Sequence, residues 1–292
     1  MIGGCPGPAP VVRPSIDTMP SPQHRYHFPN LLEAFFILIV LFFTEYLMDA
    51  LIWKLSRNAG LQPMGIYSIG RVLAHGLVFT VLLHHAKGTY RELVHENPSS
   101  WQATLAVFAG PVLLLTPGLL LIGSLLQVLV QQLFPVSSSM TDGWYKSLTD
   151  GLGAIVLVCL IAPVVEEMLF RGVILRSFLR QYPAGVAIVH SAAVFGMAHL
   201  NVYQFMLAFL LGLLLGKLYE RTRSLLPGML VHGCYNTAVT ILAWRSERSE
   251  WSTVADWSVQ WCVVALVSGG AGAWLLYKLI APRTASRTEP QA

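Results

Sequence analysis

The chain has 292 residues, of which 54% are hydrophobic and 12% are charged, and its mean hydropathy is +0.58. A soluble globular domain carries about 25% charged residues, so this chain has too few charges to cover a water-soluble globule. Disordered proteins are excluded by the same figures, because they are poor in apolar residues and rich in charge. The net charge of +4 comes without a basic cluster, so no nucleic-acid partner is expected. The composition predicts an all-α, polytopic membrane protein.

The first 30 residues are rich in proline and lack an apolar core, which predicts a disordered tail rather than a signal peptide. A helix needs about 20 apolar residues to cross a ~30 Å hydrocarbon core. By this measure we expect about eight transmembrane helices, the fifth and sixth of them short: Leu31–Trp53, Met64–His85, Ala103–Leu126, Leu148–Phe170, Ala184–Leu200, Gln204–Tyr219, Leu225–Trp244 and Trp257–Ile280.

These segments divide the chain into four parts: the tail (1–30), three N-terminal spans (31–147), a core of spans four to seven (148–244), and a last span with a short tail (245–292). Lys and Arg are more frequent on the side of the two termini than on the opposite side. The positive-inside rule then places both termini in the cytoplasm, and we expect a plasma-membrane location. The sequence does not indicate an oligomeric state.

The fourth span carries two adjacent carboxylates, Glu166 and Glu167, followed by Arg171. Ionisable groups inside a membrane are expensive unless they are paired or face water. Glu167 and Arg171 are four residues apart in the favourable order for a helical ion pair, so we pair them. Glu166 then points elsewhere, toward the interior of the bundle.

Two further spans carry polar groups at helical spacing. The fifth span has Phe195 and His199 four residues apart, and the seventh has His232 and Asn236 at the same distance. Together with Glu166 they offer a general base, its partner, and donors that could stabilise an oxyanion. This combination suits water-mediated hydrolysis of a peptide bond within the membrane.

The other polar residues of the spans have structural interpretations. Glu45 and Asp49 of the first span and Arg71 of the second are expected to form a structural ion pair. Gly212 and Gly216 form a GxxxG pattern that predicts close helix packing. The remaining histidines of these spans are expected to be hydrogen-bonded structural residues: His75, His84, His85 and His190.

The three polar patterns together resemble the CPBP family of intramembrane proteases, which includes type II CaaX prenyl endopeptidases and bacteriocin-processing and immunity-associated members. The family pattern is EExxxR, then FxxxH, then HxxxN, each on its own membrane helix. In this chain the three motifs read Glu166-Glu167-Met-Leu-Phe-Arg171, Phe195-Gly-Met-Ala-His199 and His232-Gly-Cys-Tyr-Asn236.

The resemblance implies a glutamate-type hydrolase, with the site toward the cytoplasmic end of the fourth span. Glu166 would activate a water that His199 helps to hold. His232 and Asn236 would polarise the scissile carbonyl and stabilise the oxyanion.

Supporting roles are implied for three residues: Glu167 and Arg171, which would fix the helix end, and Phe195, which would pack beside the site. The substrate would be a membrane-associated peptide or protein, either a prenylated CaaX terminus or a peptide precursor.

The sequence allows two hypotheses about the metal dependence of the proposed hydrolase. The HExxH signature of zinc proteases is absent, and Asn is a poor zinc ligand, so we expect no cofactor. In the alternative, a metalloprotease would hold zinc with Glu166, His199 and His232.

Two alternatives to a protease stay open at this point. Buried Glu and His residues also build the proton pathways of transporters, and a non-catalytic membrane scaffold would need no chemistry at all.

Overall fold

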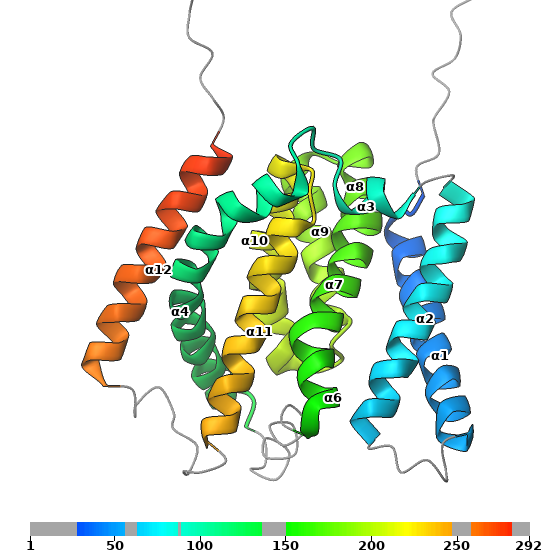
Figure 1. The fold of residues 1–292 in the computed structure, drawn as a ribbon, viewed down its shortest axis with the longest axis horizontal. Helices are drawn as coiled ribbons and strands as arrows, with labels where there is room; N and C mark the ends of the chain where they lie inside the picture. Colours follow the sequence, from blue (N-terminus) through cyan, green and yellow to red (C-terminus); the bar gives the residue numbers. More distant parts are fainter. Residues whose placement is uncertain (1–27, 56–62, 87–88, 136–149, 247–257, 282–292) are drawn as a thin grey trace, which may run out of the picture.

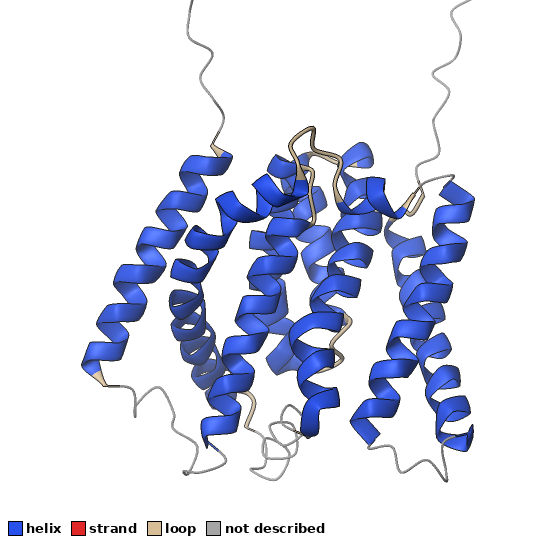
Figure 2. Cartoon of the chain, in the orientation of Figure 1, coloured by secondary structure: helices blue, strands red, loops and turns tan. Residues whose placement is uncertain are grey.

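The structure is a computed structural model that describes residues 28–55, 63–86, 89–135, 150–246 and 258–281, so most of the predicted tail lies outside the described residues. Helices make up nearly all of this part of the chain, and it contains no strand (Figure 2). The helices in chain order are α1 (Leu31–Leu55), α2 (Pro63–Ala86), α3 (Tyr90–Val94), α4 (Trp101–Leu133), α6 (Gly151–Val156), η1 (Leu157–Ile161), α7 (Ala162–Glu167), η2 (Met168–Leu175), α8 (Arg176–Gln181), α9 (Ala184–Met197), α10 (Val202–Thr222), α11 (Leu226–Ser246) and α12 (Val259–Ile280).

The long helices run side by side in one bundle (Figure 1). The pair α1 and α2 forms one edge, α4 and α12 form the other, and α7, α10 and α11 lie between them. The start of α1 and the end of α12 lie on the same face of the bundle, the upper one in Figure 1.

Six helices in the described part of the chain are long and apolar enough to cross a membrane, which confirms an all-α polytopic membrane protein. All eight predicted spans are helical, but two of them are not among these six. The first, α9, has only 14 residues, which is about 21 Å at 1.5 Å per residue. The second, α11, is 21 residues long but more polar than the six.

The fourth span is longer than predicted. It is one continuous helix from Gly151 to Gln181, built from α6, η1, α7, η2 and α8. The prediction ended it at Phe170, directly before Arg171. Instead, the Arg171 side chain is buried inside the bundle, with 1% exposed. Glu166 therefore lies midway along this helix, and the prediction that it sits near the end of the span is wrong.

Two segments of this central helix, η1 and η2, are π-helical. Such segments are rare and occur often at functional sites. Here they flank α7, which carries both glutamates of the first motif.

Side chains from three neighbouring helices donate hydrogen bonds to backbone carbonyls of the central helix. Ser68 of α2 donates to Gly153 at 3.0 Å, and Asn236 of α11 donates to Val158 at 2.9 Å. Ser191 of α9 donates to Phe170 at 3.0 Å. These bonds fix the rotation of the central helix relative to α2, α9 and α11.

The helices α4 and α12 approach each other closely through glycines. A Cβ atom added at Gly118 of α4 would lie 2.8 Å from Cα of Gly269 in α12, so a larger side chain would push the two helices apart. Pro111 and Pro117 lie inside α4, and proline in a helix interior kinks the helix.

Residues 94–96, which lie between α2 and α4, contact the turn between α10 and α11. The backbone N–H of Leu225 donates to Val94, and that of Glu96 donates to Arg223. Close by, Arg176 of α8 forms an ion pair with Glu96. This segment ties the N-terminal helices to the turn that precedes α11.

Candidate active site

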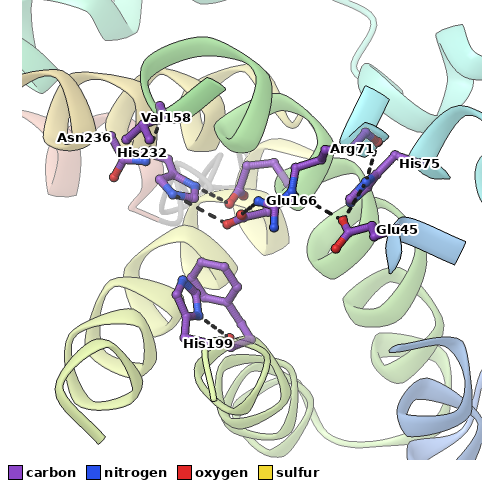
Figure 3. Close-up of polar contacts among 10 residues, drawn as sticks. Glu45, Arg71, His75, Val158, Glu166, His199, His232 and Asn236 are labelled. Carbon is purple, nitrogen blue, oxygen red and sulfur yellow. Dashed lines mark hydrogen bonds and ion pairs between the residues drawn. The ribbon is translucent and has the colours of Figure 1, made fainter. Parts of the chain in front are cut away.

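The three sequence motifs come from three elements that meet inside the bundle (Figure 3). Glu166 and Glu167 end α7, Phe195 lies on α9, and His199 lies in the turn that follows it. The third motif lies on α11. Each motif therefore presents its polar groups from a different direction.

The predicted Glu167–Arg171 pair is present and fully buried. Arg171 Nη1 lies 2.7 Å from Glu167 Oε1, and each side chain is only 1% exposed. Arg171 Nη2 donates to the backbone carbonyl of Gly212 at 3.3 Å, and its guanidinium lies 4.4 Å from the centre of the Phe195 ring. A buried charge needs such partners to offset the loss of hydration.

His232 lies between the two carboxylates of the first motif. Its Nδ1 is 3.3 Å from Glu167 Oε1, and its Nε2 is 3.9 Å from Glu166 Oε2. The second distance is too long for a direct hydrogen bond.

Phe195 connects the motifs through its ring. It contacts His199 edge-on with 5.1 Å between ring centres, and His232 in the same manner at 5.8 Å. His199 Nδ1 lies 3.0 Å from the backbone carbonyl of Phe195. No ion pair within 4 Å joins His199 to Glu166 among the described residues, so His199 lies near the carboxylate without touching it.

Asn236 contacts the central helix rather than the carboxylates. Its side-chain amide donates to the carbonyl of Val158 in η1. In this π-helical segment the N–H of Ala162 bonds to the carbonyl five residues earlier, Leu157. In the same register the donor for Val158 would be residue 163, which is a proline without an N–H. Asn236 thus supplies the hydrogen bond that Pro163 cannot make.

Two helices outside the motifs also reach the site, which sequence reasoning missed. Arg71 of α2 lies 3.3 Å from Glu166 Oε1 and 3.3 Å from Glu45 of α1. His75 Nδ1 lies 3.3 Å from the same Glu45 carboxylate. The sequence feature that could have revealed this contact is Arg71, a rare arginine within an apolar span, followed one helical turn later by His75.

The predicted ion pair of α1 and α2 is therefore correct for Glu45 and Arg71, but the pair is also part of the site. The prediction for Asp49 is wrong, because its buried Oδ1 has no hydrogen-bond partner in the described structure and it makes no ion pair with Arg71. Arg71 turns toward Glu166 instead.

Metal ligation requires several donors that converge on one point. In the described part of the chain, no group of three or more His, Cys, Asp or Glu residues is placed to hold a metal ion. Glu166, His199 and His232, the alternative ligand set, do not form such a group among the described residues.

Residues 149–238 match a protein-family model described as "Type II CAAX prenyl endopeptidase Rce1-like". The segment contains all three motifs and leaves α1, α2, α4 and α12 outside it. No curated protein and no solved structure matches the chain. Residues 149–238 are therefore similar to Rce1-like type II CAAX prenyl endopeptidases, which confirms the resemblance drawn from the three motifs.

Proposed function

We propose that this protein is an intramembrane endopeptidase in which Glu166 activates the attacking water. The family match supports an endopeptidase of the CAAX type in general. One observation carries the finer assignment: Arg71 contacts one oxygen of Glu166, and the other oxygen faces His232 Nε2 across 3.9 Å. A water bound beside these two groups would lie within reach of Glu166 as a base.

In the proposed reaction, Glu166 takes a proton from water while the water oxygen bonds to the scissile carbonyl carbon. The resulting oxyanion is stabilised by donors from α11. When the C–N bond breaks, the proton held by Glu166 passes to the leaving amine. The products are a new carboxyl end and a new amine, with no change in oxidation state.

The hydrogen bonds of the two histidines limit their roles. The Glu167 carboxylate and the Phe195 carbonyl only accept, so Nδ1 carries the proton in both His232 and His199. In its neutral form each ring then accepts at Nε2. This supports His199 as an acceptor that holds the water.

His232 can donate from Nε2 only as an imidazolium, and Glu166 and Glu167 supply the negative charges beside such a cation. Asn236 uses one N–H on Val158 and has a second N–H for the oxyanion. These two residues are our candidates for stabilising the oxyanion.

The proposed substrate is a membrane-associated peptide or protein, either a prenylated CaaX terminus or a peptide precursor. For the location we propose the plasma membrane, with both termini in the cytoplasm. The start of α1 and the end of α12 on one face support a shared side for the two ends.

The function is tested by comparing the membrane proteomes of cells that express the wild type or the Glu166→Gln variant. Removal of a general base lowers the rate by about 10²–10⁴-fold, so peptides cut by the wild type should remain uncut in the variant. The matched control is Glu220→Gln, because Glu220 forms ion pairs on α10 away from the site. Cleavage that persists in Glu166→Gln membranes would contradict the assignment of the base.

Metal dependence is tested on the purified protein in liposomes. A chelator should leave the cleavage rate unchanged. Loss of cleavage on chelation, restored by zinc, would replace the proposed mechanism with the metalloprotease alternative.

A further inference from the structure

We infer that Arg71 is a positioning residue for Glu166, and that Glu45 holds Arg71 in place for this task. The inference rests on the proposed function of Glu166. It assigns to α1 and α2, which lie outside the segment that matches the protease family, a part in the chemistry of the site.

The first step is the charge balance of the site. Arg171 and His232 both contact Glu167, and the hydrogen bonds of Arg171 go to Glu167 and to the Gly212 carbonyl rather than to Glu166. Among the described residues, Arg71 is the one Lys or Arg side chain within 4 Å of Glu166. Without it, the partly exposed Glu166 carboxylate would lack a permanent positive partner inside the bundle, which is unfavourable.

The second step is geometric. Arg71 Nη1 lies 3.3 Å from Oε1 of Glu166, while Oε2 is the oxygen that faces His232. Because one oxygen is held, the carboxylate cannot rotate freely, and Oε2 stays directed toward His232 (Figure 3). Alignment of a reacting group in this way is a large part of enzymatic rate enhancement.

The third step concerns the support of Arg71 itself. Its Nε contacts Glu45 of α1, and His75 Nδ1 contacts the same Glu45 oxygen at 3.3 Å. His75 also lies 3.0 Å from the backbone carbonyl of Arg71. The Arg71 side chain is therefore held by Glu45 at Nε and by Glu166 at Nη1, and His75 contacts the Glu45 carboxylate that supports it.

The test uses the full chain in liposomes and a farnesylated CaaX peptide with a fluorophore and a quencher. Arg71→Met should lower kcat about 100-fold with KM unchanged, because it disturbs the base and not peptide binding. Arg71→Lys should recover part of kcat, since it keeps the charge. Glu45→Gln should have a smaller effect, and the Arg71→Met/Glu45→Gln double variant should be no slower than Arg71→Met alone.

The matched control is Asp49→Asn, one turn from Glu45 on the same helix, which should leave kcat unchanged. The side chain of Arg71 is 32% exposed, so guanidinium added at millimolar concentration should restore activity to Arg71→Ala but not to Glu166→Gln. A purely structural role for Arg71 would not give this rescue.

The outcomes separate this inference from the proposed function. If Glu166→Gln is inactive while Arg71→Met keeps the wild-type kcat, the positioning role is wrong and the function stands. If the wild type cleaves neither this peptide nor any membrane protein, the proposed endopeptidase function is wrong. The contact between Arg71 and Glu166 can then still be tested by thermal unfolding. In that case Arg71→Met and Glu166→Gln should each lower Tm and the double variant no further, whereas additive losses would overturn the contact.

Discussion

The two adjacent glutamates of the central helix show how environment separates two identical side chains. Glu167 lies on a closed side of the site, where it and Arg171 are each 1% exposed. Glu166 lies on an open side, where its side chain is 16% exposed and Arg71 is 32% exposed. The closed side holds the helices together, whereas the open side leaves part of Glu166 and Arg71 exposed. One residue step along a helix is enough to separate a fully buried carboxylate from a partly exposed one.

The largest expected effect on stability comes from breaking the closed side. Arg171→Met leaves Glu167 buried without its partner, which should lower the free energy of unfolding by about 3–5 kcal/mol. Thermal unfolding in detergent measures this loss. The control is Arg71→Met, whose open position should make its loss of stability clearly smaller. Equal losses in the two variants would remove the distinction between the two sides.

A smaller loss of stability is expected when the hydrogen bond between Asn236 and the central helix is removed. Asn236→Ala leaves the part-buried Val158 carbonyl without its side-chain donor. An acceptor left without a partner costs up to about 1–3 kcal/mol when it is shielded from water. Pro163→Ala restores a backbone N–H at the position that lacks one. We therefore expect the loss from Asn236→Ala to be reduced in the Pro163→Ala background.

The same pair of variants distinguishes two roles of Asn236. If it also stabilises the oxyanion, Pro163→Ala will recover stability to Asn236→Ala but not peptide cleavage. Recovery of both stability and cleavage would show that the amide acts through the helix alone.

The smallest effect is expected at an exposed ion pair with similar helical spacing. Lys217 and Glu220 lie 2.8 Å apart on α10, with the lysine 43% exposed. Exposed pairs of this kind contribute about 0.2–1 kcal/mol, so Lys217→Met should hardly change thermal unfolding. A loss as large as that of Arg171→Met would contradict burial as the cause of the difference.

The parts of this structure that follow from local spacing could be predicted from the sequence. The apolar segments give the helices, and the four-residue spacing gives the Glu167–Arg171 pair. The family resemblance links the three motifs to one site. These features depend on residues that are neighbours in sequence or on patterns that recur within one helix.

Other features depend on contacts between distant segments, and the sequence does not specify them. Arg71 had two carboxylates nearby on α1, and its contact with Glu166 follows only from how α2 packs against the central helix. The helix continues past Arg171 because that charge is neutralised inside the bundle, which no hydropathy profile reveals. Pro163 is the one local feature of the sequence that is related to the π-helical register, because it lacks the N–H that the Val158 carbonyl would accept.

The short helix α9 has a consequence for water. It cannot reach across a ~30 Å hydrocarbon layer, so the turn that carries His199 ends at a depth where lipid chains would otherwise surround it. Irregular backbone at such a depth persists only where protein covers it or where an aqueous recess reaches it. Leu200, the next residue, is 80% exposed and has a φ of 56°. Within a bilayer, the backbone of this bend would therefore need protein or water as a partner directly beside His199.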